Sequence, residues 1–186
     1  RRQKPGAISV AGSDGDHFSG LGFIAIAEPC TVSTEHGRGD QLGDGGGVVE
    51  AIRGLLKHAV RRGIPTLTLY AFSRENWARS DEEVNGLFGL LEAAIRSETD
   101  ELRAQGVRVQ LLGRLEELPA ETRRSIDDAL AATEGGERLL LNIAFNYAGR
   151  TELVDAVRRL VEQGVTPDRI DEATISGALY TAGLPD

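Results

Sequence analysis

Apolar positions follow two different periods along the chain from Val48 onward. Stretches with a period near 3.6 residues, typical of amphipathic helices, alternate with short continuous apolar runs, typical of buried parallel strands. The alternation predicts, in chain order, a helix over 48–62, a strand over 65–72, a helix from about 81 to 102, a strand over 107–112, a helix from about 119 to 132, a strand over 139–145, an amphipathic helix closed by Gly164, and a short helix after Pro167.

This order of elements is typical of an α/β fold. Successive strands are separated by enough residues for a helical crossover, and such crossovers are normally right-handed. We therefore expect a mostly parallel central sheet with helices on both faces, and ligands bound at the carboxyl ends of the strands. Ser80 and Glu83 have the spacing of a capping box, which predicts the start of the second helix.

Residues 1–47 differ from the rest of the chain in composition and in the pattern of apolar residues. They are rich in Gly, Ser and Asp, and only one short apolar run, over 23–27, predicts a strand. The glycines between 37 and 47 are typical of a flexible loop. We expect one α/β domain over 48–186, preceded by this irregular glycine-rich segment.

Composition narrows the function. With 186 residues and 40% hydrophobic residues, the chain can bury one sizeable core, and its formal net charge of −8 argues against general binding of nucleic acid or anionic lipid. Cys30 is the only cysteine, which excludes an internal disulfide and a cysteine-based zinc site and fits a reducing cytoplasm. No run approaches the roughly 18 apolar residues of a membrane span, so we expect at most a peripheral membrane association.

Two polar clusters, over 73–79 and 146–150, directly follow predicted strands. In the first, Arg79 can grip a diphosphate, Ser73 and Asn76 can hydrogen-bond it, and Trp77 can wall off an apolar partner. The alternative is a turn capped by local hydrogen bonds. If the two strands are neighbours, Arg79 and Arg150 face one crevice, which suits a ligand with an anionic head and an apolar tail.

These residues also resemble a known family. Residues 67–79 resemble the "LTLYAFSxENWxRP" motif, and residues 141–150 the "LNIAxNYGGR" motif, of the cis-prenyltransferases, the undecaprenyl diphosphate synthase or isoprenyl transferase family. The resemblance covers about residues 48–186. It implies a Mg²⁺-dependent enzyme, a cytoplasmic homodimer, that adds isopentenyl diphosphate to an allylic diphosphate and makes a polyprenyl diphosphate with cis double bonds.

The resemblance also implies roles for individual residues. Asn76 matches the asparagine that the family links to proton removal; a neutral amide is a poor base, so we expect it to position or relay instead. The residues that match substrate-contacting segments are Ser73, Arg74, Glu75, Trp77, Arg79 and Arg150. The helix that lines the family's product tunnel carries Leu87, Phe88, Leu91 and Ile95, for which an ordinary core role is an equal alternative.

The sequence departs from the family pattern at both ends. The "MDGNGRW" segment that supplies a metal-binding aspartate is absent, and only Glu28 lies near its place as a candidate Mg²⁺ ligand. The "GHxxG" segment is replaced by the glycines of 43–47, which suit a linker better than a phosphate loop. The "RTSGE" and "RxSNF" segments do not appear before the last residue, Asp186. We therefore expect a C-terminally truncated fragment or impaired form, with weak or no turnover.

Three hypotheses follow for function. The first is a cis-prenyltransferase, whole or damaged. The second is a non-catalytic partner subunit of such an enzyme, which the missing aspartate fits and the retained Asn76, Trp77 and Arg79 oppose. The third, an unrelated phosphate- or nucleotide-binding module, is disfavoured because neither a Walker A nor a Rossmann glycine pattern follows any strand.

Overall fold

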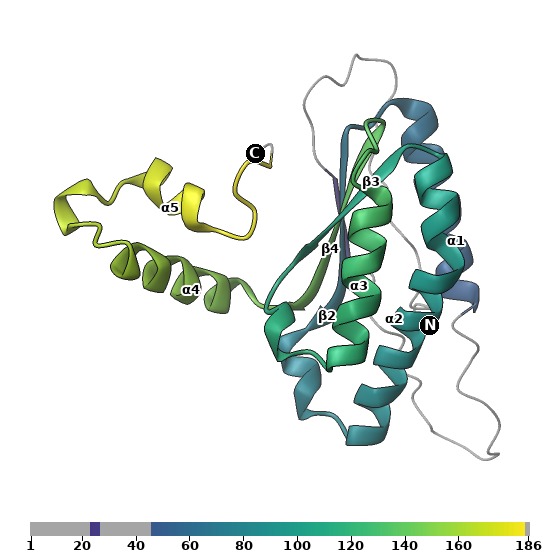
Figure 1. The fold of residues 1–186 in the computed structure, drawn as a ribbon, viewed down its shortest axis with the longest axis horizontal. Coiled ribbons are helices and arrows are strands. Elements are labelled where there is room, and N and C mark those ends of the chain that lie inside the picture. The colour runs from purple at the N-terminus through teal and green to yellow at the C-terminus, as the bar shows by residue number, and fades with distance from the viewer. Residues whose placement is uncertain (1–22, 27–45, 185–186) are drawn as a thin grey trace, which may run out of the picture.

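The computed structural model describes residues 23–26 and 46–184. Its centre is a four-stranded parallel sheet in the order β1-β2-β4-β3, shown in Figure 1. The strands are β1 (Phe23–Ile26), β2 (Thr66–Ser73), β3 (Val107–Leu112) and β4 (Leu139–Tyr147). The prediction of an α/β fold with a mostly parallel sheet is confirmed. The expectations for Glu28 and Cys30 fall outside the described residues.

Three helices cover one face of the sheet, and two more continue from the carboxyl end of β4 on the other side (Figure 1). The covering helices are α1 (Gly46–Arg62), α2 (Asp81–Ala104) and α3 (Ala120–Thr133), followed in the chain by α4 (Gly149–Glu162) and α5 (Glu172–Ala178). Short 3-10 turns lie between them: η1 (Arg74–Ala78), η2 (Leu115–Glu117) and η3 (Pro167–Arg169).

Local sequence signals place the ends of these elements. The predicted capping box is present: the Ser80 hydroxyl accepts from the backbone N–H of Glu83 at 3.3 Å, and the Glu83 carboxylate accepts from the backbone N–H of Ser80 at 3.2 Å. Strand β4 runs two residues beyond the predicted Phe145, because Tyr147 still lies in register with Ser73 of β2. Helix α1 begins at Gly46, two residues before the predicted start.

The core has two main parts on the helix-covered face. Under α1, aliphatic side chains fill the space: Leu56, Ala59, Leu67, Leu69, Val107, Val109, Leu139 and Leu141. Between α2, α3 and the carboxyl half of the sheet lies an aromatic cluster, which we define as Phe72, Val84, Phe88, Leu118, Ile126 and Phe145. The predicted tunnel residue Phe88 belongs to this aromatic cluster, and Leu87, Leu91 and Ile95 pack against it.

Helix α4 is amphipathic, as its sequence predicted, but its apolar side is only partly covered. Leu160 and Ala156 are buried against α5, whereas the apolar residues Leu153, Val154, Val157 and Val161 are between 47% and 68% exposed. The described residues therefore cover one edge of the stripe. Among them, no helix is long and apolar enough to cross a membrane.

Candidate functional site

The two polar clusters lie next to each other because β2 and β4 are direct neighbours. Register pairing continues to the ends of both strands, where Ser73 lies opposite Tyr147. The segment over 73–79 and the segment over 146–150 therefore leave the sheet at the same edge. The condition on which the two-cluster site rested, that the strands be neighbours, is confirmed.

The turn after β2 is held by its own polar side chains. The Asn76 amide oxygen accepts from the backbone N–H of Ser73 at 2.7 Å, and the Ser73 hydroxyl donates to the Glu75 carboxylate at 2.6 Å. The hydrogen bond from Ser73 lowers the pKa of Glu75. The carbonyl of Asn76 also accepts from the backbone N–H of Arg79 at 3.1 Å. Local capping, the alternative interpretation of this segment, thus accounts for part of its polar character.

Asn146 joins three segments at the centre of the site. Its side chain is fully buried, and its backbone has a φ of 52°, a left-handed conformation that asparagine tolerates better than most residues. Its amide oxygen accepts from the indole N–H of Trp77 at 2.8 Å. Its amide NH₂ donates to the Arg114 carbonyl at 2.8 Å and to the Glu117 carboxylate at 3.0 Å. The loops after β2 and β3 are therefore tied to the end of β4.

Trp77 connects this polar centre with the apolar interior. Its ring centroid lies 5.7 Å from that of Phe72, edge-on, and 5.6 Å from that of Phe88 on α2. The side chain is 39% exposed even though its N–H is bonded to buried Asn146. One edge of the indole is therefore fixed in the aromatic cluster while part of it still faces solvent, the position from which it can contact a ligand.

The three candidate cations of the site differ in their partners. Arg74 forms an ion pair with Glu117 at 2.5 Å. Arg79, half-buried at the end of η1, and Arg150, exposed in the first turn of α4, form no ion pair with any residue in the described part of the chain. The structure thus leaves two of the three predicted guanidinium groups without an internal carboxylate at this edge of the sheet.

A second network fixes α4 and the segment after α5 behind these residues. Arg114 donates to both carboxylate oxygens of Asp155, at 2.6 and 2.7 Å, and the Tyr180 hydroxyl donates to the same carboxylate. The hydrogen bond from Arg114 holds the pKa of Asp155 low, at about 2. The buried carboxylate of Glu152 accepts from the Tyr147 hydroxyl at 2.5 Å, and burial together with this bond raises the pKa of Tyr147.

Sequence reasoning missed two of these carboxylates. Glu117 and Glu152 lie in the η2 turn and on the first turn of α4, where acidic residues normally face solvent. No motif or periodicity marked them, and only their partners 28 or more residues away show their role. Arg114, which lies two residues after β3, is the cation that serves both networks.

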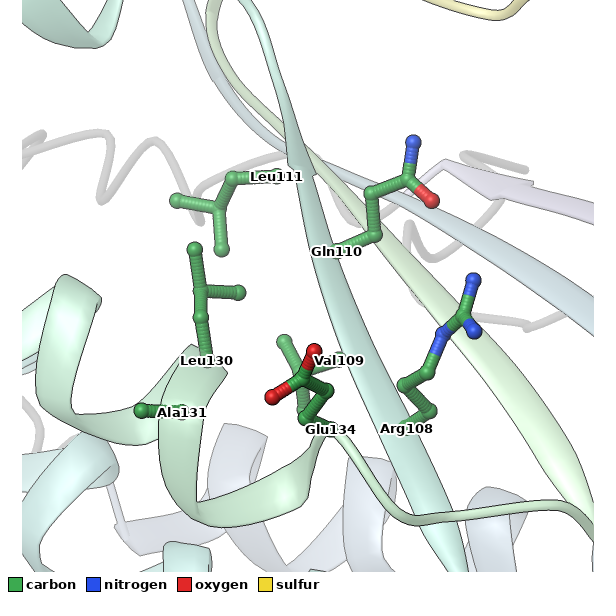
Figure 2. A pocket seen from close by; sticks show the side chains of 7 residues that line it. All are labelled: Arg108, Val109, Gln110, Leu111, Leu130, Ala131 and Glu134. Carbon is green, nitrogen blue, oxygen red and sulfur yellow. The ribbon is translucent and has the colours of Figure 1, made fainter.

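A metal site is not formed by the described residues. Within 23–26 and 46–184, no group of three or more His, Cys, Asp or Glu side chains comes close enough to hold an ion. A shallow hollow of about 350 Å³ lies along the edge strand β3, beside α3, and contains none of the predicted site residues (Figure 2). Figure 2 shows Leu111 and Leu130 on one side of this strand and Arg108 with Gln110 on the other.

The fold and the paired motifs define a class of protein, and comparison with known families agrees. The family model for undecaprenyl diphosphate synthase prenyltransferases matches residues 34–186. The chain therefore belongs to this family, as the resemblance implied. The match begins upstream of residue 48, the expected start of the resemblance.

Curated relatives carry the description isoprenyl transferase. The chain is 46% identical over 142 residues to that of Heliobacterium mobile, covering 74% of this chain and 55% of the relative. It is 39% identical over 142 residues to that of Clostridium perfringens, covering 74% of this chain and 56% of the relative. The chain thus spans about half the length of the curated relatives it matches.

Solved structures show the same fold. A "probable undecaprenyl diphosphate synthase" from Campylobacter jejuni superposes with a TM-score of 0.67 and 27% identity, covering 74% of this chain and 65% of that one. Lavandulyl diphosphate synthase from Lavandula x intermedia, solved with dimethylallyl diphosphate, gives a TM-score of 0.68 and 32% identity, covering 72% of this chain and 59% of that one.

Proposed function

We propose that this chain performs, or forms the larger part of an enzyme that performs, cis-prenyl chain elongation. In this reaction the carbon–oxygen bond of an allylic diphosphate breaks, the double bond of isopentenyl diphosphate attacks the resulting cation, and a proton is lost. The product is a polyprenyl diphosphate lengthened by one unit. The site must therefore hold a departing diphosphate and exclude water from an apolar chain.

One observation carries this proposal: the hydrogen bond from the Trp77 indole to Asn146. It joins the two family motifs, whose bonded residues are 69 positions apart, at one edge of the sheet. Asn146 contacts Arg74 and Glu117, whereas Trp77 packs on Phe72 and Phe88 of the aromatic cluster. An anionic group and an apolar chain can thus be bound side by side, which is the shape of a prenyl diphosphate.

The side chains of the two polar clusters have different proposed roles, which follow from their chemistry. Arg79 and Arg150 supply guanidinium groups for the diphosphate, and the N-terminus of α4, where Arg150 lies, adds a favourable partial charge. Ser73 and Glu75 shape the turn, and Trp77 covers the apolar part of the substrate. Asn76 has its amide oxygen engaged by Ser73, so its NH₂ is the group left for positioning or proton relay.

The apolar tail is proposed to follow α2. Leu87, Phe88, Leu91 and Ile95 lie in or against the aromatic cluster, directly beyond Trp77. An elongating chain that enters past the indole would meet these side chains first. Their present contacts are those of an ordinary core, so a tunnel requires α2 to move away from α3 and the sheet.

Mg²⁺ is expected from the family resemblance alone. The described residues do not provide its ligands, and Glu28 lies outside them. By the same resemblance we expect a cytoplasmic homodimer with at most a peripheral membrane association. Bound Mg²⁺ would neutralise charge on the departing diphosphate, a role that the arginines described above could share but not replace.

A labelled-substrate assay tests the proposal. Incubation with farnesyl diphosphate, radiolabelled isopentenyl diphosphate and Mg²⁺ should give low but measurable incorporation into longer prenyl diphosphates. Asn76→Ala should abolish incorporation, and Arg96→Ala, an exposed residue near the middle of α2, should leave it unchanged. Equal incorporation by the wild type and by Asn76→Ala, or none by either together with no binding of farnesyl diphosphate, would contradict the proposal.

A further inference from the structure

Glu117 occupies the middle of the cationic site. It ends the η2 turn after β3, and its carboxylate accepts three hydrogen bonds from separate segments. One oxygen accepts from Arg74 at 2.5 Å and from the Asn146 amide at 3.0 Å. The other oxygen accepts from Arg114 at 3.0 Å. Its side chain keeps 34% of its surface exposed, so an ion in solution can reach this position.

The groups around Glu117 are the ones that recognise phosphate oxygens. Two guanidinium groups and an amide NH₂ converge on one anion, and arginine binds carboxylate and phosphate with the same planar donor geometry. Burial alone would raise the pKa of Glu117, but the hydrogen bonds from its three partners outweigh this effect and lower it to about 2. The carboxylate is therefore a full negative charge at neutral pH.

The two arginines differ in how firmly they are committed. Arg114 is held by both oxygens of Asp155 in addition to Glu117. Among the residues that the structure describes, Arg74 has only Glu117 and a long contact of 3.5 Å to the Asn146 amide oxygen. If Glu117 were removed or displaced, Arg74 would lose its ion pair, whereas Arg114 would keep its ion pair with Asp155. It lies in η1, on the same turn as Trp77, beside the proposed diphosphate position.

We propose that Glu117 is an internal competitor for the diphosphate, which occupies Arg74 until an anionic ligand displaces it. The inference rests on the proposed function, because it assumes that a diphosphate binds at this edge of the sheet. The part of the free site formed by Arg74 and Arg114 is then close to neutral, since each of these two arginines faces a carboxylate. A ligand must carry enough charge to replace Glu117, so the contact sets both the affinity of the site and its preference for highly charged anions.

The test uses charge-neutral variants of matched position. Glu117→Gln keeps an oxygen that can accept from Arg74 but removes the charge. Glu116→Gln makes the same change in net charge at the preceding, exposed residue, which forms no ion pair within the described part of the chain. Binding of inorganic pyrophosphate to each 186-residue chain is measured by calorimetry in low salt without metal, after circular dichroism has shown the fold to be intact.

We expect Glu117→Gln to bind pyrophosphate roughly three- to ten-fold more tightly than the wild type, and Glu116→Gln to bind like the wild type. The double variant Arg74→Gln/Glu117→Gln should lose the gain, because the released cation is gone. Unchanged or weaker binding by Glu117→Gln overturns the inference, as does an equal gain in Glu116→Gln or in the double variant.

The same experiment separates this inference from the proposed function. Wild-type binding that is weakened by Arg79→Ala supports the diphosphate site whatever Glu117 does. Wild-type binding with no gain in Glu117→Gln overturns only the competitor role. Absence of pyrophosphate binding in every variant overturns both.

Discussion

The indole N–H of Trp77 donates to the buried amide oxygen of Asn146 at 2.8 Å, and this bond fastens the loop after β2 to the end of β4. Neither residue alone distinguishes a binding site from a turn. Together they place an amphipathic ring between cationic side chains and an aromatic core. The following predictions test whether this connection and the contacts around it behave as the structure requires.

Substitution of Asn146 should show how much its hydrogen bonds contribute to the free energy of unfolding. Asn146→Ala should lower the free energy of unfolding by about 2–4 kcal/mol, because three hydrogen bonds of a buried side chain are lost and alanine disfavours the positive φ. Asn146→Gly accepts this φ without strain, so it should lose about 1 kcal/mol less. Urea unfolding followed by circular dichroism measures both. If the alanine variant has the same free energy of unfolding as the wild type, the Asn146 side chain does not stabilise the fold.

Gly113, which lies against the backbone of Phe145 and Asn146, allows a steric test of the turn after β3. A Cβ added there would lie 2.1 Å from the carbonyl oxygen of Phe145, and the residue has a φ of 138°. We expect Gly113→Ala to lower the free energy of unfolding by about 3 kcal/mol or more, because backbone atoms must move. Gly86→Ala on α2, where a Cβ meets open space, should instead stabilise by about 0.5–1 kcal/mol. Similar unfolding midpoints for the two variants would contradict the turn geometry.

The fold follows closely from local patterns, whereas the site does not. The bounds of β3 and the Ser80 cap were predicted correctly, because a run of apolar residues and a capping box both depend on residues that are close in sequence. The β2–β4 pairing was raised only as a condition, since strand order depends on contacts far apart in sequence. The roles of Asn146 and Glu117 were not predicted, because an asparagine after a strand and a glutamate in a turn are ordinary loop residues until their distant partners are known.

The exposed apolar stripe on α4 also shows that a local pattern does not identify distant packing partners. The spacing of Leu153, Val157 and Val161 correctly predicted an amphipathic helix, yet these side chains remain exposed in the described structure. A helical period indicates that one side seeks an apolar partner, but it does not identify the partner. In the same way, the apolar spacing on α2 suited a tunnel and a core equally, and the structure shows core contacts there.

Acid should weaken the network behind the site. The pKa of Asp155 is about 2 in the folded protein, below its ordinary value of 3.8, chiefly because of its hydrogen bond from Arg114. A depressed folded pKa adds stability above the unfolded value, and this stability is lost as pH falls from about 4 to 2. The contribution is up to about 2 kcal/mol. Unfolding of the wild type and of Asp155→Asn, measured across this range, should show a shallower pH dependence in the variant.

Glu117 has a pKa window that overlaps this one, so Glu117→Gln is the companion measurement. Each single variant should remove part of the acid sensitivity, and the double variant should remove more than either. If Asp155→Asn shows the full pH dependence of the wild type, the Arg114–Asp155 pair does not supply the stability that its geometry indicates.

The most direct test of the diphosphate site is the affinity of the intact chain for farnesyl diphosphate, followed by quenching of Trp77, the only tryptophan. Arg79→Ala should weaken binding by about ten-fold or more, because a charge-assisted contact to the diphosphate is lost. The matched control Arg96→Ala, on α2, should bind like the wild type. If Arg79→Ala binds as tightly as Arg96→Ala, the ends of β2 and β4 do not form the diphosphate site.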